Sequence, residues 1–333
     1  MNSKFEKWDE NCTLESLQNI ADACVHCGKC RENCAFLDKY EMDLGDVTKL
    51  QEHIYGCFLC GNCDRVCPAG ISGRQLFQNL RRMQVRDGKL EEKPYSFVLK
   101  EKKDYKFRNY RNATVGRVLF PGCNFPSMFP KSNRKIVDLC KAKGIGTVSD
   151  CCGKPIAELG LYRDEERIIN RICRELESRD IDEVITTCPN CYYFLKERIP
   201  QKVRSIYEVL PELVPEISVP EGIEIQIPCP DRTDREWYDG ICKLLGYEPA
   251  VTAAEQCCGL GGMASAEEPE LAKKFGGGLT SSGLRNTSFC ASCAGQYARN
   301  GKEIRHVLSL LLGTEEAPAT KTSYLNRVKT KYK

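Results

Sequence analysis

Hydrophobic positions recur at helical spacing near the start of the chain, and short apolar runs alternate with helical stretches after residue 115. Leucine and isoleucine follow a capping threonine over 13–23, and an arginine-rich amphipathic stretch covers 74–85, so each predicts a helix. Predicted strands lie at 118–120, 147–149, 183–187, 223–227 and 287–289. Predicted helices lie at 134–142, 164–178, 235–245 and 269–279. This alternation favours parallel α/β layers, in which ligands gather beyond the carboxyl ends of the strands.

Cysteine is the unusual component, with 22 in 333 residues beside only 3 histidines. Two runs, 24–34 and 57–67, follow the spacing C-x2-C-x2-C-x3-C, in which three thiolates bind one cubane and the fourth binds the other cluster. Zinc, the alternative, leaves the third evenly spaced cysteine of each run unexplained. We therefore predict two [4Fe-4S] cubanes, one on Cys24, Cys27, Cys30 and Cys67 and the other on Cys34, Cys57, Cys60 and Cys63.

A set of five cysteines then occurs twice, in the same order and at a near-constant offset. The first copy is Cys123, Cys151, Cys152, Cys188 and Cys191, and the second is Cys229, Cys257, Cys258, Cys290 and Cys293. Glycine at 153 and 259 permits a tight turn after each adjacent pair. Because five thiolates exceed the four of a tetrahedral zinc site, a cluster of several irons suits each copy better. Two copies of one metal-binding module are predicted.

Together, the two ferredoxin-type runs and the two C…CCG…CxxC modules make the chain resemble the catalytic iron-sulfur subunit of heterodisulfide reductase in its fused form, and the wider CCG-domain family. The resemblance implies an α+β multidomain chain, with an α-helical ferredoxin followed by two repeated α/β CCG modules. It also implies that each five-cysteine set holds a noncubane [4Fe-4S] cluster, with zinc at one of them as an alternative. Proline on both sides of Cys229 departs from the family pattern, which leaves open which module reacts.

The predicted division of the chain has five parts. They are a ferredoxin over 1–86, a connector over 87–115, a first CCG module over 116–222, a second CCG module over 223–313 and a basic tail over 314–333. The connector is lysine-rich and carries several aromatic residues, so it either lies on a neighbouring domain or is a solvated linker. For the tail, which has no acidic residue after Glu316, we favour a disordered solvated segment over a docking segment.

Several other residues have less specific interpretations. Cys12, Cys140, Cys173 and Cys242 are the cysteines outside the predicted sets, and we interpret them as structural. His26 and His53 are interpreted as hydrogen-bonded surface histidines. Lys154 either offsets cluster charge or is solvated. The segment 259–262 lacks the G-x-G-x-x-G spacing of a nucleotide loop, so we interpret it as backbone close to a cluster.

Composition limits the partners and the compartment. The net charge of +3, from 49 basic and 46 acidic residues, gives no strong attraction to nucleic acid. The start of the chain lacks the apolar core of a signal peptide, and the best apolar window, 307–312, is too short to span a bilayer. We expect a cytoplasmic protein, with peripheral association at the inner membrane through a partner as the alternative. A secreted disulfide scaffold is disfavoured because such scaffolds are usually short.

The predicted function is an iron-sulfur oxidoreductase that passes electrons through two cubanes to the CCG sites and reduces a disulfide, with a small thiol or disulfide as substrate. The sequence shows no flavin or nicotinamide fingerprint, so the electron donor is expected to be a separate protein, a flavoprotein, with a membrane cytochrome or quinone-linked partner as a further option. The alternative is an electron-transfer role between a glycolate, lactate or glycerol-3-phosphate dehydrogenase and a quinone-linked or soluble acceptor. A zinc-held scaffold is the non-redox alternative.

Overall fold

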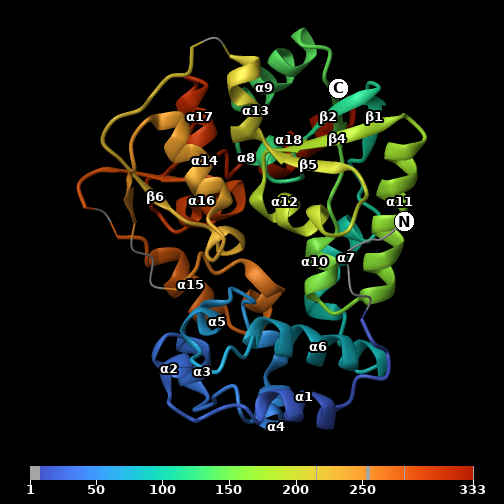
Figure 1. Cartoon of the computed structure of the whole chain (residues 1–333), viewed down its shortest axis with the longest axis vertical. Helices are drawn as coiled ribbons and strands as arrows, with labels where there is room; N and C mark the ends of the chain where they lie inside the picture. The colour runs from blue at the N-terminus through green and yellow to red at the C-terminus, as the bar shows by residue number, and fades with distance from the viewer. Residues whose placement is uncertain (1–7, 215, 253–255, 281, 333) are drawn as a thin grey trace.

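Helices and turns make up the first part of the chain. The computed structural model describes residues 8–214, 216–252, 256–280 and 282–332, and its part before residue 109 contains no strand. The helices there are α1 (Leu14–Ala21), α2 (Lys29–Glu32), α3 (Ala35–Lys39), α4 (Val47–Glu52), η1 (Ile54–Gly56), α5 (Asn62–Val66), α6 (Gly73–Arg86), η2 (Lys93–Tyr95) and α7 (Ser96–Lys102). Figure 1 shows α1 to α6 gathered at one end of the molecule.

Both helices predicted for this end are present, and local sequence explains where they begin. Thr13 caps α1 in a capping box, because its hydroxyl accepts from the Ser16 backbone N–H while Ser16 Oγ accepts from the Thr13 N–H. The hydroxyl of Ser72 accepts from the Gln75 N–H in the same way at the start of α6. The apolar faces of the two helices pack into one core that also contains the cysteine loops.

Two sheets form the rest of the fold. The first contains β1 (Asn109–Asn112), β2 (Gly116–Phe120), β3 (Gly146–Ser149), β4 (Ile181–Thr186) and β5 (Lys202–Ser205), in the order β1-β3-β2-β4-β5. The second contains β6 (Ile223–Gln226), β7 (Ala250–Val251), β8 (Arg285–Ser288) and β9 (Arg305–His306), in the order β7-β6-β8-β9. All neighbours are parallel except β1 and β3. Apart from β1, both sheets therefore have the same strand order. In each sheet the direction in which successive strands are added changes between two central neighbours, β2 and β4 in the first sheet and β6 and β8 in the second.

Helices cover both sheets, and a single apolar core joins the sheets to each other. The helices are α8 (Phe125–Met128), α9 (Pro130–Ala142), α10 (Lys154–Glu158), α11 (Tyr162–Glu177), α12 (Pro189–Lys196), α13 (Ile206–Leu213), η3 (Cys229–Asp231), α14 (Glu236–Leu245), η4 (Gly261–Ala266), α15 (Pro269–Gly277), α16 (Ala291–Arg299), α17 (Val307–Leu311) and α18 (Ser323–Tyr332). Each strand and helix predicted after residue 115 has its counterpart here, with small differences at the ends. No helix within the described ranges is both long and apolar enough to cross a bilayer.

The connector and the tail are more ordered than their composition suggests. The connector contains α7 and β1, and its Tyr95, Tyr105 and Tyr110 are buried, so it lies on the first sheet and its helices. The expectation of a disordered, solvated tail is wrong, because residues 323–332 form α18. Asn326 Nδ2 donates to the backbone oxygen of Ser127 at 3.0 Å, which holds α18 against α8. A helix that is held by polar contacts does not need a regular spacing of apolar residues, so the sequence pattern did not predict it.

A buried arginine joins the helical end to both sheet regions. Arg81, on α6, is completely buried and donates five hydrogen bonds, all to backbone oxygens. The acceptors are Ile54 and Cys57 in the helical end, Glu158 on α10 and Gly262 on η4. Gly262 has a φ of +64°, and a Cβ there would lie 2.4 Å from the oxygen of Cys57. The glycine therefore allows η4 to approach the cysteine loop closely.

Candidate functional site

The two cysteine runs at the helical end form similar loops. His26 and Leu59 both have a φ of 49°, and the glycines two residues later, Gly28 and Gly61, have φ values of 75° and 67°. In each loop a backbone N–H, of His26 or Leu59, donates to the sulfur of the run's first cysteine at 3.4 Å. This left-handed turn wraps the backbone around the space between the thiols, as a cluster-binding loop requires.

The structure brings the eight cysteines of these runs together in two groups of four. Cys24, Cys27, Cys30 and Cys67 line one small cavity. The other group is Cys34, Cys57, Cys60 and Cys63, where burial raises the pKa of the Cys63 thiol and the three neighbouring thiols raise it further. The sequence predicts the same two groups, in which the fourth cysteine of each run joins the first three of the other run. Cluster binding itself remains a prediction. Cys27 is exposed, so the first group lies at the surface.

The first five-cysteine set lies where the strand order of the first sheet reverses. Cys123 follows β2 and Cys188 follows β4, two parallel neighbours, while Cys151 and Cys152 follow β3. Hydrogen bonds from the Cys151 and Cys191 thiols lower the pKa of Cys152. Gly153 turns the chain after the pair with a φ of +93°. All five thiols therefore converge beyond the carboxyl ends of the strands, where ligands bind in such sheets.

The second set repeats this arrangement on the second sheet. Cys229 and Cys290 follow the parallel neighbours β6 and β8, and Cys293 lies one turn into α16. The thiol of Cys257 contacts that of Cys229, and the thiol of Cys258 contacts that of Cys293. Gly259 has a φ of +80°, and a Cβ there would lie 2.5 Å from the oxygen of Ala272. Only glycine fits both the turn and this close approach.

Three of the four groups also touch one another in a fixed order. Cys60 of the second ferredoxin-type group contacts Cys257, and the contact lowers the pKa of Cys60. Cys290 of the second set contacts Cys188 of the first set in turn, and this lowers the pKa of Cys290. The contacts therefore run from the group at Cys60, through the second five-cysteine set, to the first five-cysteine set. The exposed group at Cys27 precedes them in this series, because the same two loops carry the cysteines of both ferredoxin-type groups.

Gln256 spans the contact between the helical end and the second sheet. Its Nε2 donates to the sulfurs of Cys34 and Cys60, both at 3.5 Å, and its Oε1 accepts from the Ala35 N–H at 2.9 Å. Arg232 reinforces the same contact, donating to the backbone oxygens of Cys60 and Gln256 and lying 3.8 Å from the sulfur of Cys229. Sequence reasoning missed both residues, since no spacing relates them to cysteines about two hundred residues earlier.

Buried polar side chains lie beside both five-cysteine sets. The Tyr297 hydroxyl has no hydrogen-bond partner among the described residues, and it lies close to four thiols of the second set, including Cys257 and Cys258. Lys102 Nζ pairs with Glu101 Oε1 at 2.6 Å, and the nearby Cys123 and Cys151 thiols of the first set raise the pKa of this lysine against the effect of its burial. A bound group that carries sulfide and thiolate acceptors would satisfy the Tyr297 hydroxyl. The thiol-rich ligand set and this unpaired donor therefore fit iron-sulfur clusters.

The other residues singled out in the sequence have local partners. His26 Nδ1 lies 2.8 Å from Asp43 Oδ2 at the edge of the first group, with Cys24 close enough that the three could hold a metal ion. His53 stacks on Tyr40, with ring centroids 3.8 Å apart. Lys154 pairs with Glu158. Of the remaining cysteines, Cys140 is fully buried, and the partly buried ones are Cys12, Cys173 and Cys242.

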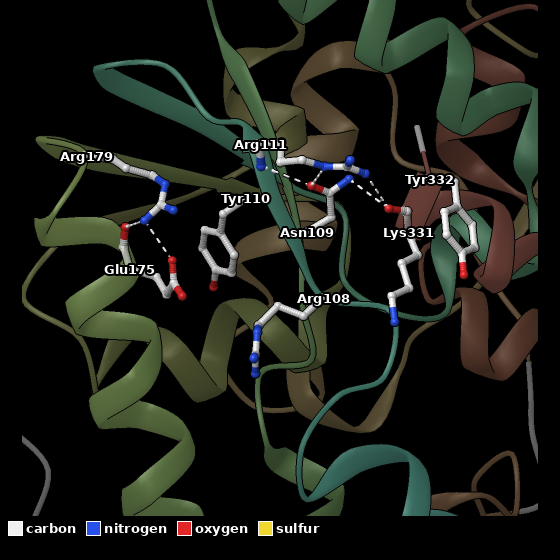
Figure 2. A pocket seen from close by; sticks show the side chains of 8 residues that line it. All are labelled: Arg108, Asn109, Tyr110, Arg111, Glu175, Arg179, Lys331 and Tyr332. Carbon is white, nitrogen blue, oxygen red and sulfur yellow. Dashed lines mark hydrogen bonds and ion pairs between the residues drawn. The ribbon is translucent and has the colours of Figure 1, made fainter.

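One surface cleft reaches a cysteine of the second set, and a smaller pocket elsewhere is lined by no cysteine. A cleft of about 910 Å³ runs between α6, α10, α12 and η3 and reaches Cys229, with Arg74 and Thr233 in its wall. A smaller pocket of about 380 Å³ lies between β1, α11 and α18, lined largely by basic side chains (Figure 2). The cleft gives a small molecule access to the second set, since Cys229 is only partly buried.

Two protein families match parts of the chain. Residues 20–71 match the 4Fe-4S dicluster domain, and residues 118–196 and 231–281 match the cysteine-rich domain called CCG. The first CCG match includes all five cysteines of the first set. The second includes Cys257 and Cys258 but ends before Cys290.

Curated relatives are similar over most of the chain. One component of the fumarate reductase (CoM/CoB) of Methanothermobacter marburgensis is 24% identical over 76% of this chain and 61% of its own length. One component of the dihydromethanophenazine:CoB–CoM heterodisulfide reductase of Methanosarcina mazei is 22% identical over 79% of this chain and 83% of its own. An uncharacterized iron-sulfur protein of Methanocaldococcus jannaschii is 26% identical over 72% of this chain. This chain spans only 55% of that last relative's length.

The resemblance that the cysteine pattern predicts is therefore confirmed by the domain matches and by the relatives. The chain is an iron-sulfur protein that combines a 4Fe-4S dicluster domain with CCG cysteine-rich domains, and it is similar to one of the components of heterodisulfide reductase.

Proposed function

We propose that the chain is an iron-sulfur oxidoreductase that reduces a disulfide with electrons from a separate protein. The single observation that carries this proposal is that thiol contacts join neighbouring cysteine groups, Cys60 to Cys257 and Cys290 to Cys188. One-electron transfer falls steeply with distance, so carriers in such a series must lie close together. The names of the relatives support an oxidoreductase role.

The cysteines would hold four clusters. We propose cubanes on the two groups of the helical end and noncubane [4Fe-4S] clusters on the two five-cysteine sets, with zinc at one of those sets as the alternative. Bound there, the clusters would supply one-electron transfer and the reducing power to split a sulfur–sulfur bond. The matching strand order of the two sheets supports the division into an α-helical ferredoxin and two repeated CCG modules.

The residues around Cys229 suit a disulfide substrate. The cleft between α6 and η3 admits a small molecule as far as Cys229, and Arg74 and Arg232 place two positive charges nearby. Reduction of a disulfide breaks one S–S bond and consumes two electrons and two protons, so negative charge builds up on sulfur before the protons arrive. The two guanidinium groups would stabilise that charge in a partly buried site.

The alternative is an electron-transfer protein that binds no substrate itself. The exposed first group favours docking of a donor at the helical end, where Val25 is 68% and Ile20 is 55% exposed. We propose a flavoprotein as this donor, since the cysteine series would need a carrier that converts two-electron into one-electron transfer. A membrane cytochrome or quinone-linked partner would serve the alternative role.

Disulfide turnover separates the two functions. Anaerobically prepared protein is supplied with reduced methyl viologen and the CoB–CoM mixed disulfide, which the names of two relatives indicate as the first substrate to test. We expect viologen oxidation with release of two thiols per disulfide, and we expect its loss in Cys229→Ser. Protein with all its clusters and no turnover would support the electron-transfer role instead.

Gln256→Leu is expected to lower the reduction potential of the cubane on Cys34, Cys57, Cys60 and Cys63. Its two N–H···S bonds stabilise the more negative, reduced cluster, and each bond of about 1 kcal/mol corresponds to about 40 mV for one electron. The measurement is a redox titration followed by electron paramagnetic resonance. Gln75→Leu is the matched control, because it makes the same replacement at a glutamine that lies elsewhere, on α6. An unchanged potential in Gln256→Leu would contradict the assigned role of this side chain.

A further inference from the structure

The outer face of α18 has the composition of a protein interface. Tyr324, Leu325 and Tyr332 are 50%, 59% and 74% exposed, so three of the most exposed large apolar side chains of the described residues lie on one ten-residue helix. The helix also carries Lys329 and Lys331 and has no acidic residue. Aromatic residues are enriched at interfaces between proteins.

Basic side chains from neighbouring elements extend this face. Arg108 and Lys331 line the same pocket, and Figure 2 shows Arg179 on the far side of Tyr110 from them. Arg179 pairs with Glu175 in the wall, and Arg108 pairs with nearby Asp104. Within the described ranges, the side chains of Arg111 and Lys331 have no carboxylate partner. A second groove of about 650 Å³ continues from the pocket past Arg108 and Lys331.

This face carries a larger positive charge than the chain as a whole. We define the α18 face by its six cations, Lys106, Arg108, Arg111, Arg179, Lys329 and Lys331. Asp104 and Glu175 are the acids among them, which leaves a surplus of four positive charges, whereas the whole chain has a net charge of +3. The positive field is therefore concentrated here, and it would steer an acidic partner to this place.

The α18 face covers the far end of the cysteine series. Tyr105 and Phe107 line the groove beside α18 and also form a cluster with Cys151, against which Cys123 and Val328 pack. One layer of side chains thus separates the groove from two cysteines of the first set. The exposed group at Cys27 lies in the helical end, far from α18 along the long axis of the molecule (Figure 1).

We propose that the α18 face docks an acidic electron-transfer protein, which exchanges single electrons with the cluster of the first five-cysteine set. This inference rests on the proposed function, because it requires clusters on the cysteine series. In each encounter the reduced partner loses one electron and the chain gains one, so two encounters supply the two electrons that one disulfide consumes. The chain then has two docking surfaces, one at each end of the series.

The experiment uses an acidic plant-type [2Fe-2S] ferredoxin as the probe, with stopped-flow absorbance reporting its oxidation by the cluster-loaded chain. The variant is Lys329→Glu with Lys331→Glu. The control is Lys141→Glu with Lys143→Glu, which makes the same change in charge at the same spacing, at two exposed lysines where α9 ends. We expect about a tenfold slower reaction in the α18 variant, a wild-type rate in the control, and a wild-type rate that falls with added salt.

Equal rates in the two variants, or a rate that salt does not change, would overturn the proposal. The same preparations are tested for viologen-driven disulfide turnover, which the α18 variant should retain in full. If no preparation turns over the disulfide, and only the α18 variant oxidises ferredoxin slowly, disulfide reduction is rejected. The docking surface is then still supported. Normal turnover with equal ferredoxin rates would reject the docking surface alone.

Discussion

Cys152→Ser is expected to remove the spectroscopic signal of one CCG site and to leave both cubane signals unchanged. Cys152 is buried at the centre of the first set, in contact with Cys151 and Cys191, and a serine oxygen is a poor substitute for a thiolate that binds iron. The eight ferredoxin-type cysteines lie in separate loops, so their clusters should remain. Iron content should fall by the amount of one cluster.

Low-temperature electron paramagnetic resonance of the reduced protein, together with iron analysis, checks this result. Cys173→Ser is the control, since this cysteine lies on α11 outside all the sets and is only partly buried. Loss of every cluster signal in Cys152→Ser, with Cys173→Ser unaffected, would mean that the sets do not form independent sites.

Arg81→Met is expected to lower the free energy of unfolding by at least about 3 kcal/mol. Methionine fills a similar volume but has no donor, so four backbone oxygens from three segments lose their hydrogen bonds in a buried place. An unpaired buried polar group costs about 1–3 kcal/mol, and neighbouring losses partly compensate each other. Because the acceptors belong to the helical end and to both sheet regions, the helical end should also become more sensitive to protease.

Urea unfolding under anaerobic conditions, followed by circular dichroism, measures this change. Arg163→Met removes an arginine whose side chain is 78% exposed and should change stability by less than about 0.5 kcal/mol. Equal stability of the two variants would show that Arg81 does not join the parts of the fold.

Features set by neighbouring residues were predictable from the sequence. The cysteine runs form their loops through local turns at Gly28 and Gly61, and the helix and strand periodicity after residue 115 places Cys123 and Cys188 at strand ends. Cys140, interpreted as structural, is fully buried within α9.

Features that depend on distant residues were not predictable. Gln256 reaches the sulfur of Cys34 across 222 positions, and Lys102 comes from a segment that resembled a linker. The tail gave the clearest error. Its helix is held by polar contacts, such as the hydrogen bond from Arg327 to Glu101 at 2.7 Å, and a lysine-rich sequence gives no apolar pattern that would indicate them.

The central claim is that iron-sulfur clusters occupy the eighteen cysteines of the four sets. Its most direct test is analysis of iron, acid-labile sulfide and zinc in protein purified without exposure to air. The account predicts a brown protein with iron and sulfide in nearly equal amounts, sufficient for four clusters, or for three clusters with one zinc. A colourless protein that contains only zinc, or no metal, would contradict it.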